Sequence, residues 1–184
     1  MEPLKHRTIN SSARSLADLV HAMDTGDLDL DPPYQRGDVW TVQQRVNLIK
    51  SILLGVPIAA VVISNRGDNG WWTGKVNAND PYYACIDGKQ RLTSVSWFMK
   101  SDFLVPAWWF DGRWLEPTGY EHVAYKELTQ AGQRFFRNQA ILPVAEAKLR
   151  DMAEEAEVYD LINSAGTAHT DGDLVAARQM KDAR

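Results

Sequence analysis

Apolar side chains recur at helical spacing along several stretches of the chain, and capping residues mark where these helices begin. Ser12 or Ser15 caps a first expected helix, which Gly26 ends. Thr41 and Gln44 form a capping box for a second helix. Four further helices are expected at residues 88–99, 129–138, 150–163 and 174–180. The pattern therefore predicts a helical C-terminal part, at about residues 120–180.

Short apolar runs between these helices predict the strands of a sheet. Residues 58–63 and 82–86 are apolar and rich in β-branched or aromatic side chains, which indicates buried strands, and residues 28–30 form a shorter one. Residues 140–145 predict a further strand, at a sheet edge because Pro143 has no N–H to donate. Asp111-Gly112, between two apolar runs, predicts a hairpin.

This mixed order of helices and strands predicts an α+β fold, with one small mixed sheet packed against helices. We expect a single domain over residues 1–184, with its core at about 28–115 and a helical C-terminal extension at about 120–180.

Composition narrows the class of protein. The chain has 184 residues, of which 45% are hydrophobic and 24% charged, as in soluble globular proteins. A net charge of -4 argues against a protein that coats nucleic acid by charge alone, although a local basic groove remains compatible with it. The single cysteine, Cys85, excludes an intrachain disulfide. With no signal-like N-terminus and no apolar run of about 20 residues, we expect a cytoplasmic protein without membrane contact.

A polar cluster with the chemistry of a phosphate site follows the second buried strand: Asp87-Gly88-Lys89-Gln90-Arg91. The start of a helix leaves backbone N–H groups unpaired and carries a partial positive charge, and glycine lets a ligand approach the backbone. Lys89 and Arg91 add two cations, Asp87 could hold a metal ion or accept a proton, and Gln90 could orient a water molecule. In the structural alternative, Asp87 only caps the helix and both cations lie in solvent.

A second polar segment, Tyr34-Gln35-Arg36, lies in a proline-fixed loop that Trp40 closes. An aromatic ring, an amide and a guanidinium group can stack a base and clamp a phosphate. Alternatively, the loop is structural and its aromatic residues close one end of the core. The pairs Trp71-Trp72 and Trp108-Trp109 either cover sheet surface or form a stacking platform for bases.

The remaining metal and nucleophile candidates are weaker. The four histidines lack the spacing of metal ligands, and they are His6, His21, His122 and His169. Cys85 falls inside an expected buried strand, where a small apolar role fits better than catalysis.

Three blocks of sequence, in order, resemble the N-terminal domain family of GmrSD-type restriction enzymes. They are residues 31–40 with 48–58, residues 86–94, and residues 158–167 with 173–174. The middle block resembles the Asp-Gly-x-Gln-Arg signature of that family. The resemblance implies a ParB/sulfiredoxin-like fold. It also implies nucleoside triphosphate binding and hydrolysis, with DNA nicking or cleavage in defence against phage.

The resemblance assigns roles by position. The expected catalytic residues are Asp87, Gln90 and Arg91, and Asp87 is also the expected Mg²⁺ ligand. The expected nucleotide- and phosphate-binding residues are Gly88, Lys89, Arg36, Gln35, Tyr34 and Asn163. Lys89 occupies the variable position of the signature. Leu161 stands where the family often has arginine, so the third block lacks a basic residue that would contribute to the site.

Several alternatives stay open at this point. No His-Asn-His-type motif follows the third block, so we expect any DNA cleavage to come from this domain or from a separate nuclease subunit. A non-catalytic regulator, carried by a phage or plasmid, is the main alternative; it would bind a nucleotide, nucleic acid or a host defence protein.

Overall fold

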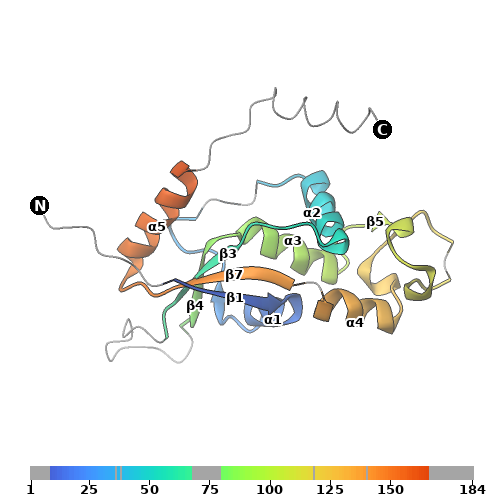
Figure 1. Ribbon diagram of the computed structural model, residues 1–184, viewed down its shortest axis with the longest axis horizontal. Helices are drawn as coiled ribbons and strands as arrows, with labels where there is room; N and C mark the ends of the chain where they lie inside the picture. Colours follow the sequence, from blue (N-terminus) through green and yellow to red (C-terminus); the bar gives the residue numbers. More distant parts are fainter. Residues whose placement is uncertain are drawn as a thin grey trace, which may run out of the picture.

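The computed structural model describes residues 9–35, 37, 39–67, 80–117, 119–139 and 141–165. Its centre is a five-stranded sheet with the strand order β1-β7-β3-β4-β2 (Figure 1). The strands are β1 (Ile9–Ser15), β2 (Leu28–Asp29), β3 (Val61–Asn65), β4 (Tyr83–Asp87) and β7 (Ile141–Ala147). A small second sheet pairs β5 (Val105–Pro106) with β6 (His122–Val123).

Five α-helices pack around this sheet within the described residues, so the predicted α+β class is confirmed. They are α1 (Leu16–Asp24), α2 (Val42–Leu54), α3 (Lys89–Met99), α4 (Gln130–Gln139) and α5 (Met152–Ala165). Three short 3₁₀ helices are η1 (Ala107–Trp109), η2 (Gly112–Trp114) and η3 (Tyr125–Glu127). The sheet is mixed, because β1 is antiparallel to β7 and β3 to β4, whereas β3–β7 and β2–β4 are parallel. The ParB/sulfiredoxin-like assignment stays a prediction.

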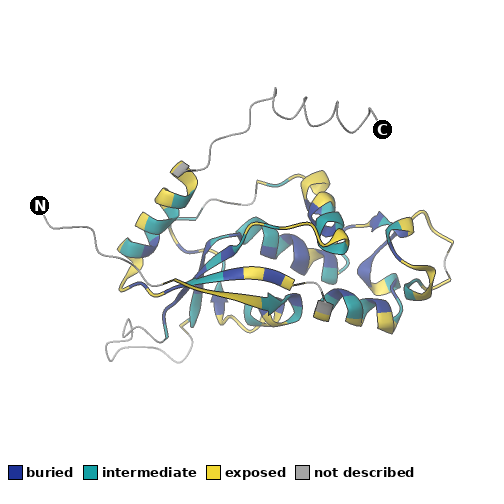
Figure 2. Cartoon of the chain, viewed as in Figure 1, coloured by how far each residue is buried: buried dark blue, intermediate teal, exposed yellow. Residues whose placement is uncertain are grey.

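The hydrophobic core has a large and a small part. The large part lies among α1, α2, α3, α4 and the sheet, and its most completely buried large side chains include Phe98 and Phe136 (Figure 2). The small part comprises Ile86, Ala147 and Leu149, covered by α5. In Figure 1, α5 lies at one end of the molecule and the lobe of residues 103–128 at the other.

The predicted helix caps are confirmed where the structure describes them. Ser15 accepts a hydrogen bond from the Asp18 backbone N–H and so caps α1. Thr41 and Gln44 form the expected capping box of α2, and Gly55 ends that helix with φ 66°. The helix expected at 174–180 lies outside the described residues.

The hairpin predicted around Asp111-Gly112 is wrong. A two-residue hairpin of that type needs positive φ at both central residues, whereas Asp111 has φ -60°. Its side chain instead accepts a hydrogen bond from the Arg113 backbone N–H and caps η2. β5 pairs with β6 rather than with residues 113–115.

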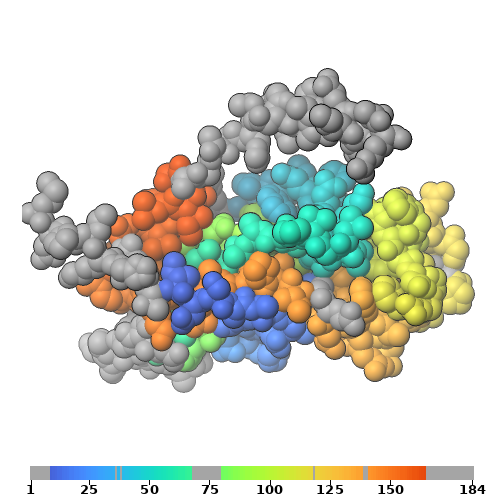
Figure 3. Space-filling view, in the orientation of Figure 1, coloured from blue at the N-terminus to red at the C-terminus, as the bar shows by residue number. Residues whose placement is uncertain are grey.

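The edge position predicted from Pro143 is also wrong, since β7 lies between β1 and β3. Pairing with β3 begins only at Val144, so Pro143 has a neighbouring strand on one side, opposite Ala13. The missing N–H therefore removes no bond from the β3 ladder. The two edges of the sheet are β1 and β2. β1 is a polar strand that sequence patterning missed, and it lies on the surface in Figure 3.

The apolar run at residues 58–63 contains a strand, as predicted, but β3 begins at Val61 rather than at residue 58. Within the described part of the chain, no helix is both long and apolar enough to cross a membrane.

Candidate functional site

A pocket of about 240 Å³ surrounds the start of α3. Three parts of the chain form it: the loop before α2, the junction of β4 with α3, and the second half of α5. The lining residues are Gln35, Gly37, Val39, Trp40, Asp87, Gly88, Lys89, Gln90, Arg91, Tyr159 and Asn163. The structure therefore brings the whole signature together with Gln35 and Asn163, which lie far from it in sequence.

Gly88 makes the sharp turn from β4 into α3. It is the N-cap of the helix, with φ 106° and no side-chain capping bond. A Cβ atom at this position would lie 2.9 Å from Val61 Cγ2, and positive φ is itself costly for residues other than glycine. The alternative in which Asp87 caps the helix is wrong, because the N-cap is Gly88 and the helix start has no side-chain capping bond.

Both cations of the signature face carboxylates of the same chain. Arg91 Nη2 lies 2.6 Å from Asp87 Oδ2 and also donates to the Ala60 carbonyl at 3.2 Å. Lys89 Nζ forms an ion pair with Asp31, whose side chain is 81% exposed. The pocket thus holds two anchored positive charges beside the positive end of a helix.

Two glutamine amides tie the loop to the signature. Gln35 Nε2 donates to the carbonyl oxygens of Cys85 and Ile86, at 2.8 and 2.7 Å. Gln90 Nε2 donates to the Gly37 carbonyl at 3.1 Å, and its Oε1 accepts from the Trp40 N–H at 3.4 Å. These bonds hold the loop against the signature and so form part of the pocket wall.

Arg36, which the sequence predicted to bind phosphate, lies outside the described residues.

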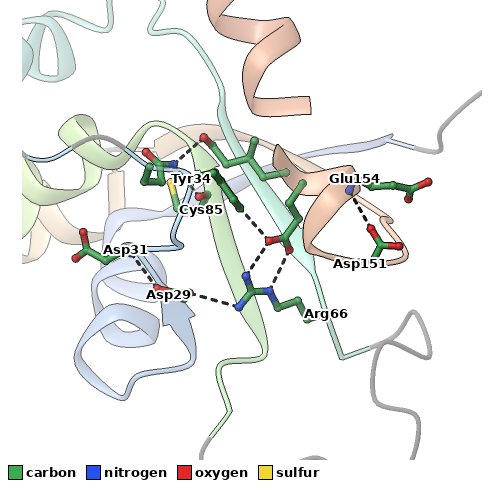
Figure 4. Close-up of polar contacts among 10 residues, drawn as sticks. Asp29, Asp31, Tyr34, Arg66, Cys85, Asp151 and Glu154 are labelled. Atoms are coloured by element: carbon green, nitrogen blue, oxygen red, sulfur yellow. Dashed lines mark hydrogen bonds and ion pairs between the residues drawn. The ribbon is translucent and has the colours of Figure 1, made fainter. Parts of the chain in front are cut away.

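Tyr34 is turned away from the pocket toward a buried ion pair (Figure 4). Its hydroxyl donates to Glu155 Oε2 at 3.0 Å. Arg66 forms two bonds to Glu155, from Nε at 3.0 Å and from Nη2 at 2.7 Å, and Nη1 lies 3.4 Å from Asp29 Oδ2. Burial and the Glu155 charge raise the pKa of Tyr34, so its hydroxyl stays protonated.

The family model for the N-terminal domain of GmrSD restriction endonucleases matches residues 16–180. The chain belongs to this family. The match spans all three blocks on which the sequence resemblance rests, and it indicates a role in a restriction system. No curated protein and no solved structure matches the chain.

Three charged residues of this GmrSD N-terminal domain support the site, although sequence reasoning did not select them: Arg45, Arg66 and Glu155. Arg45 is buried, donates to Ser94 Oγ at 3.0 Å and to the Trp40 carbonyl at 3.3 Å, and so fixes α2 against α3. Glu155 was detectable, because it shares one face of α5 with Tyr159 and Ile162 at helical spacing. A charged residue on an apolar face signals a buried partner.

Cys85 lies under the site in β4 and is fully buried. Burial, with a smaller contribution from the Asp87 charge, raises the pKa of its thiol to about 12. Since the thiolate is the nucleophilic form, this environment supports the structural interpretation of Cys85.

Of the two tryptophan pairs, Trp71 and Trp72 lie outside the described residues. Trp108 is 77% exposed and Trp109 is half-buried. Both lie in the lobe at the end of the molecule opposite α5, and neither lines the pocket at α3.

Proposed function

We propose that the pocket at the start of α3 binds a nucleoside triphosphate with Mg²⁺ and hydrolyses it, and that this turnover serves DNA restriction. The observation that carries the proposal is the glycine turn at Gly88, which begins α3 without a side-chain cap in a pocket that Lys89 and Arg91 also line. Helix starts of this kind bind phosphate through backbone N–H groups and the helix dipole.

The ion pairs of the pocket suggest how phosphate is received. Asp31 is largely solvent-exposed, so its ion pair with Lys89 contributes little stability and is easily exchanged for a phosphate oxygen. Arg91 adds a partly buried guanidinium group, which suits bidentate binding of phosphate. Arg36 and Asn163 complete the expected phosphate-binding set, and Asn163 lines the pocket from α5.

Asp87 fits the part of a Mg²⁺ ligand. Proteins commonly hold Mg²⁺ through one or two carboxylates, with substrate phosphates and water completing the octahedron. Asp87 lines the pocket and is partly exposed, so its carboxylate is accessible to a hydrated ion. When bound, the ion would neutralise phosphate charge. Arg91 Nη2 donates to Asp87 Oδ2 at 2.6 Å and so holds the carboxylate in place.

The proposed division of roles is electrostatic and positional. The Asp87 carboxylate positions the attacking water, while Lys89, Arg91 and the helix start stabilise charge on the phosphates. Gln90 holds the loop at Gly37 and Trp40, which keeps the pocket wall in place. The expectation that Gln90 also orients water stays a prediction.

The test is phosphate release from ATP, GTP and CTP with Mg²⁺, in the presence and absence of DNA. Asp87→Ala should abolish turnover, whereas Asp102→Ala, an exposed carboxylate beyond the other end of α3, should leave it unchanged. Equal turnover in the wild type and Asp87→Ala would contradict the assignment. Absence of turnover in all three proteins, with every nucleotide and with DNA, would favour the non-catalytic regulator.

A further inference from the structure

A second cavity, of about 700 Å³, lies on the other side of Lys89. It runs between α3 and the segment that joins α1 to β2. Gly37 and Lys89 line both cavities, so the two spaces meet at the Lys89–Asp31 ion pair. A ligand longer than a polyphosphate could therefore extend from one cavity into the other.

The charges of the two cavities differ in a way that orients such a ligand. Among the described residues, the first is lined by Lys89, Arg91 and a helix start against one carboxylate, Asp87. The second is lined, among the described residues, by three carboxylates and two lysines. Each of these carboxylates has a cationic partner and keeps further lone pairs: Asp24 pairs with Lys100, Asp29 with Arg66 and Asp31 with Lys89. Phosphate groups are repelled by carboxylates, so they belong in the first cavity. The second suits an uncharged group with N–H donors.

Trp97 offers a fixed aromatic surface in the second cavity. The buried Arg45 guanidinium group lies 4.2 Å from the ring centroid and holds the indole in place. Even so, Trp97 stays 39% exposed and lines the cavity. Lys89, Thr93 and Trp97 follow one another at intervals of four residues, so they share one side of α3.

We propose that this second cavity is the nucleobase subsite of the nucleotide bound at the start of α3. The base stacks on Trp97 while the phosphates lie at Lys89 and Arg91, and the carboxylates of the cavity accept hydrogen bonds from N–H groups of the base. The inference rests on the proposed function, because it assumes that the first cavity receives the phosphates.

The test compares a nucleoside triphosphate with inorganic tripolyphosphate, both titrated calorimetrically in the presence of Mg²⁺. Tripolyphosphate reports on the first cavity alone, whereas the nucleotide reports on both. The wild type should bind the nucleotide more tightly. Trp97→Ala should lower nucleotide affinity by roughly tenfold, the loss expected for one stacked base, and leave tripolyphosphate affinity unchanged.

Two further variants control for the role of Trp97 in packing. Trp97→Phe retains an aromatic face and should keep most of the preference for nucleotide. Trp108→Ala removes a more exposed tryptophan, outside both cavities, and should bind both ligands as the wild type does.

The outcomes separate the two proposals. If the wild type binds neither ligand, the proposed function fails, and the base subsite fails with it. If the wild type binds tripolyphosphate as tightly as the nucleotide, the base subsite alone is overturned. Equal loss of both ligands in Trp97→Ala and Trp97→Phe would also overturn the subsite, because Trp97 would then support the phosphate pocket.

Discussion

At the scale of single residues, Gly88 combines two constraints in one position. Its φ of 106° disfavours any side chain, and Val61 Cγ2 leaves no room for a Cβ atom. We expect Gly88→Ala to lower the free energy of unfolding by about 2–3 kcal/mol, since strain and overpacking add. It should also abolish nucleotide binding, because the relaxed turn would move the first N–H groups of α3. Urea unfolding and calorimetric titration measure the two effects.

Gly55→Ala is the matched control for this prediction. Gly55 also has positive φ, 66°, but nothing lies within 4 Å of the position of an added Cβ atom. The variant should lose about 1 kcal/mol of stability and bind nucleotide normally. Normal nucleotide binding by a folded Gly88→Ala variant would show that the turn is not part of the site.

Loss of the Arg91 side chain should weaken nucleotide binding while the protein still folds. Its guanidinium group is held by Asp87 and by the Ala60 carbonyl, and Asp87 remains partly solvated when Arg91 is removed. We expect Arg91→Ala to keep its circular dichroism spectrum while nucleotide affinity falls at least roughly tenfold, as for the loss of a charged hydrogen bond. Unchanged affinity in the folded variant would remove Arg91 from the phosphate site.

The sequence allowed the signature residues to be predicted because they are contiguous, but their partners were not predictable in the same way. Asp31 lies 58 residues before Lys89, and Arg66 lies 89 residues before Glu155. An ion pair that crosses the fold leaves no local spacing to detect. Tyr34 shows the same limit, since this predicted ligand-binding residue donates its hydroxyl to Glu155, a partner 121 residues away in sequence.

At the scale of elements, α5 is attached to the sheet by a buried charge as well as by apolar packing. Glu155 is 0% exposed and binds Arg66 through both carboxylate oxygens. We expect Glu155→Gln to lower the free energy of unfolding by about 3 kcal/mol, because Arg66 would lose its charge partner. Nucleotide affinity should fall too, since α5 carries Tyr159 and Asn163 into the pocket.

The neighbouring glutamate provides the control, because Glu154 of α5 pairs with Arg150, a largely exposed residue that precedes the helix. Glu154→Gln should cost much less stability, since an ion pair with a solvent-exposed partner is weak. Similar chemical denaturation midpoints for the two variants would mean that the Arg66–Glu155 pair does not hold α5.

Elements with strong local signals were predicted well, and those defined by their neighbours were not. The capping box and terminal glycine of α2 correctly bounded that helix. β1 has mostly polar side chains and becomes a strand only because β7 offers its free edge. The Asp111-Gly112 dipeptide is compatible with a hairpin or a 3₁₀ cap, and tertiary packing decided between them.

At the scale of the whole molecule, buried acidic groups predict a loss of stability at alkaline pH. The folded-state pKa of Cys85 is raised to about 12 by burial, from about 8.5 in an unfolded chain. The contribution of the protonated thiol to the free energy of unfolding is therefore complete below about pH 8.5, and it is lost as the pH rises toward 12. Burial raises the pKa of the Tyr34 hydroxyl as well, so Tyr34 acts in the same direction.

Urea unfolding between pH 7 and pH 10.5 measures this loss. The free energy of unfolding should fall above about pH 8.5, by up to about 1.4 kcal/mol per pH unit for the thiol. Cys85→Ala should show a shallower slope, whatever its stability at pH 7. Identical slopes would mean that the thiol is solvated in the folded state.

The ion pairs at Lys89 and Arg91 also have a consequence for the response to salt. Asp31 and Asp87 are covalently attached competitors, present at these cations at a local concentration that dissolved chloride does not reach. At any ionic strength, a phosphate must displace Asp31 from Lys89 and must share the Arg91 guanidinium group with Asp87, and added chloride changes that competition little. Salt dependence of phosphate binding at this pocket should therefore be shallower than at a patch of solvent-facing lysines, where screening acts in full.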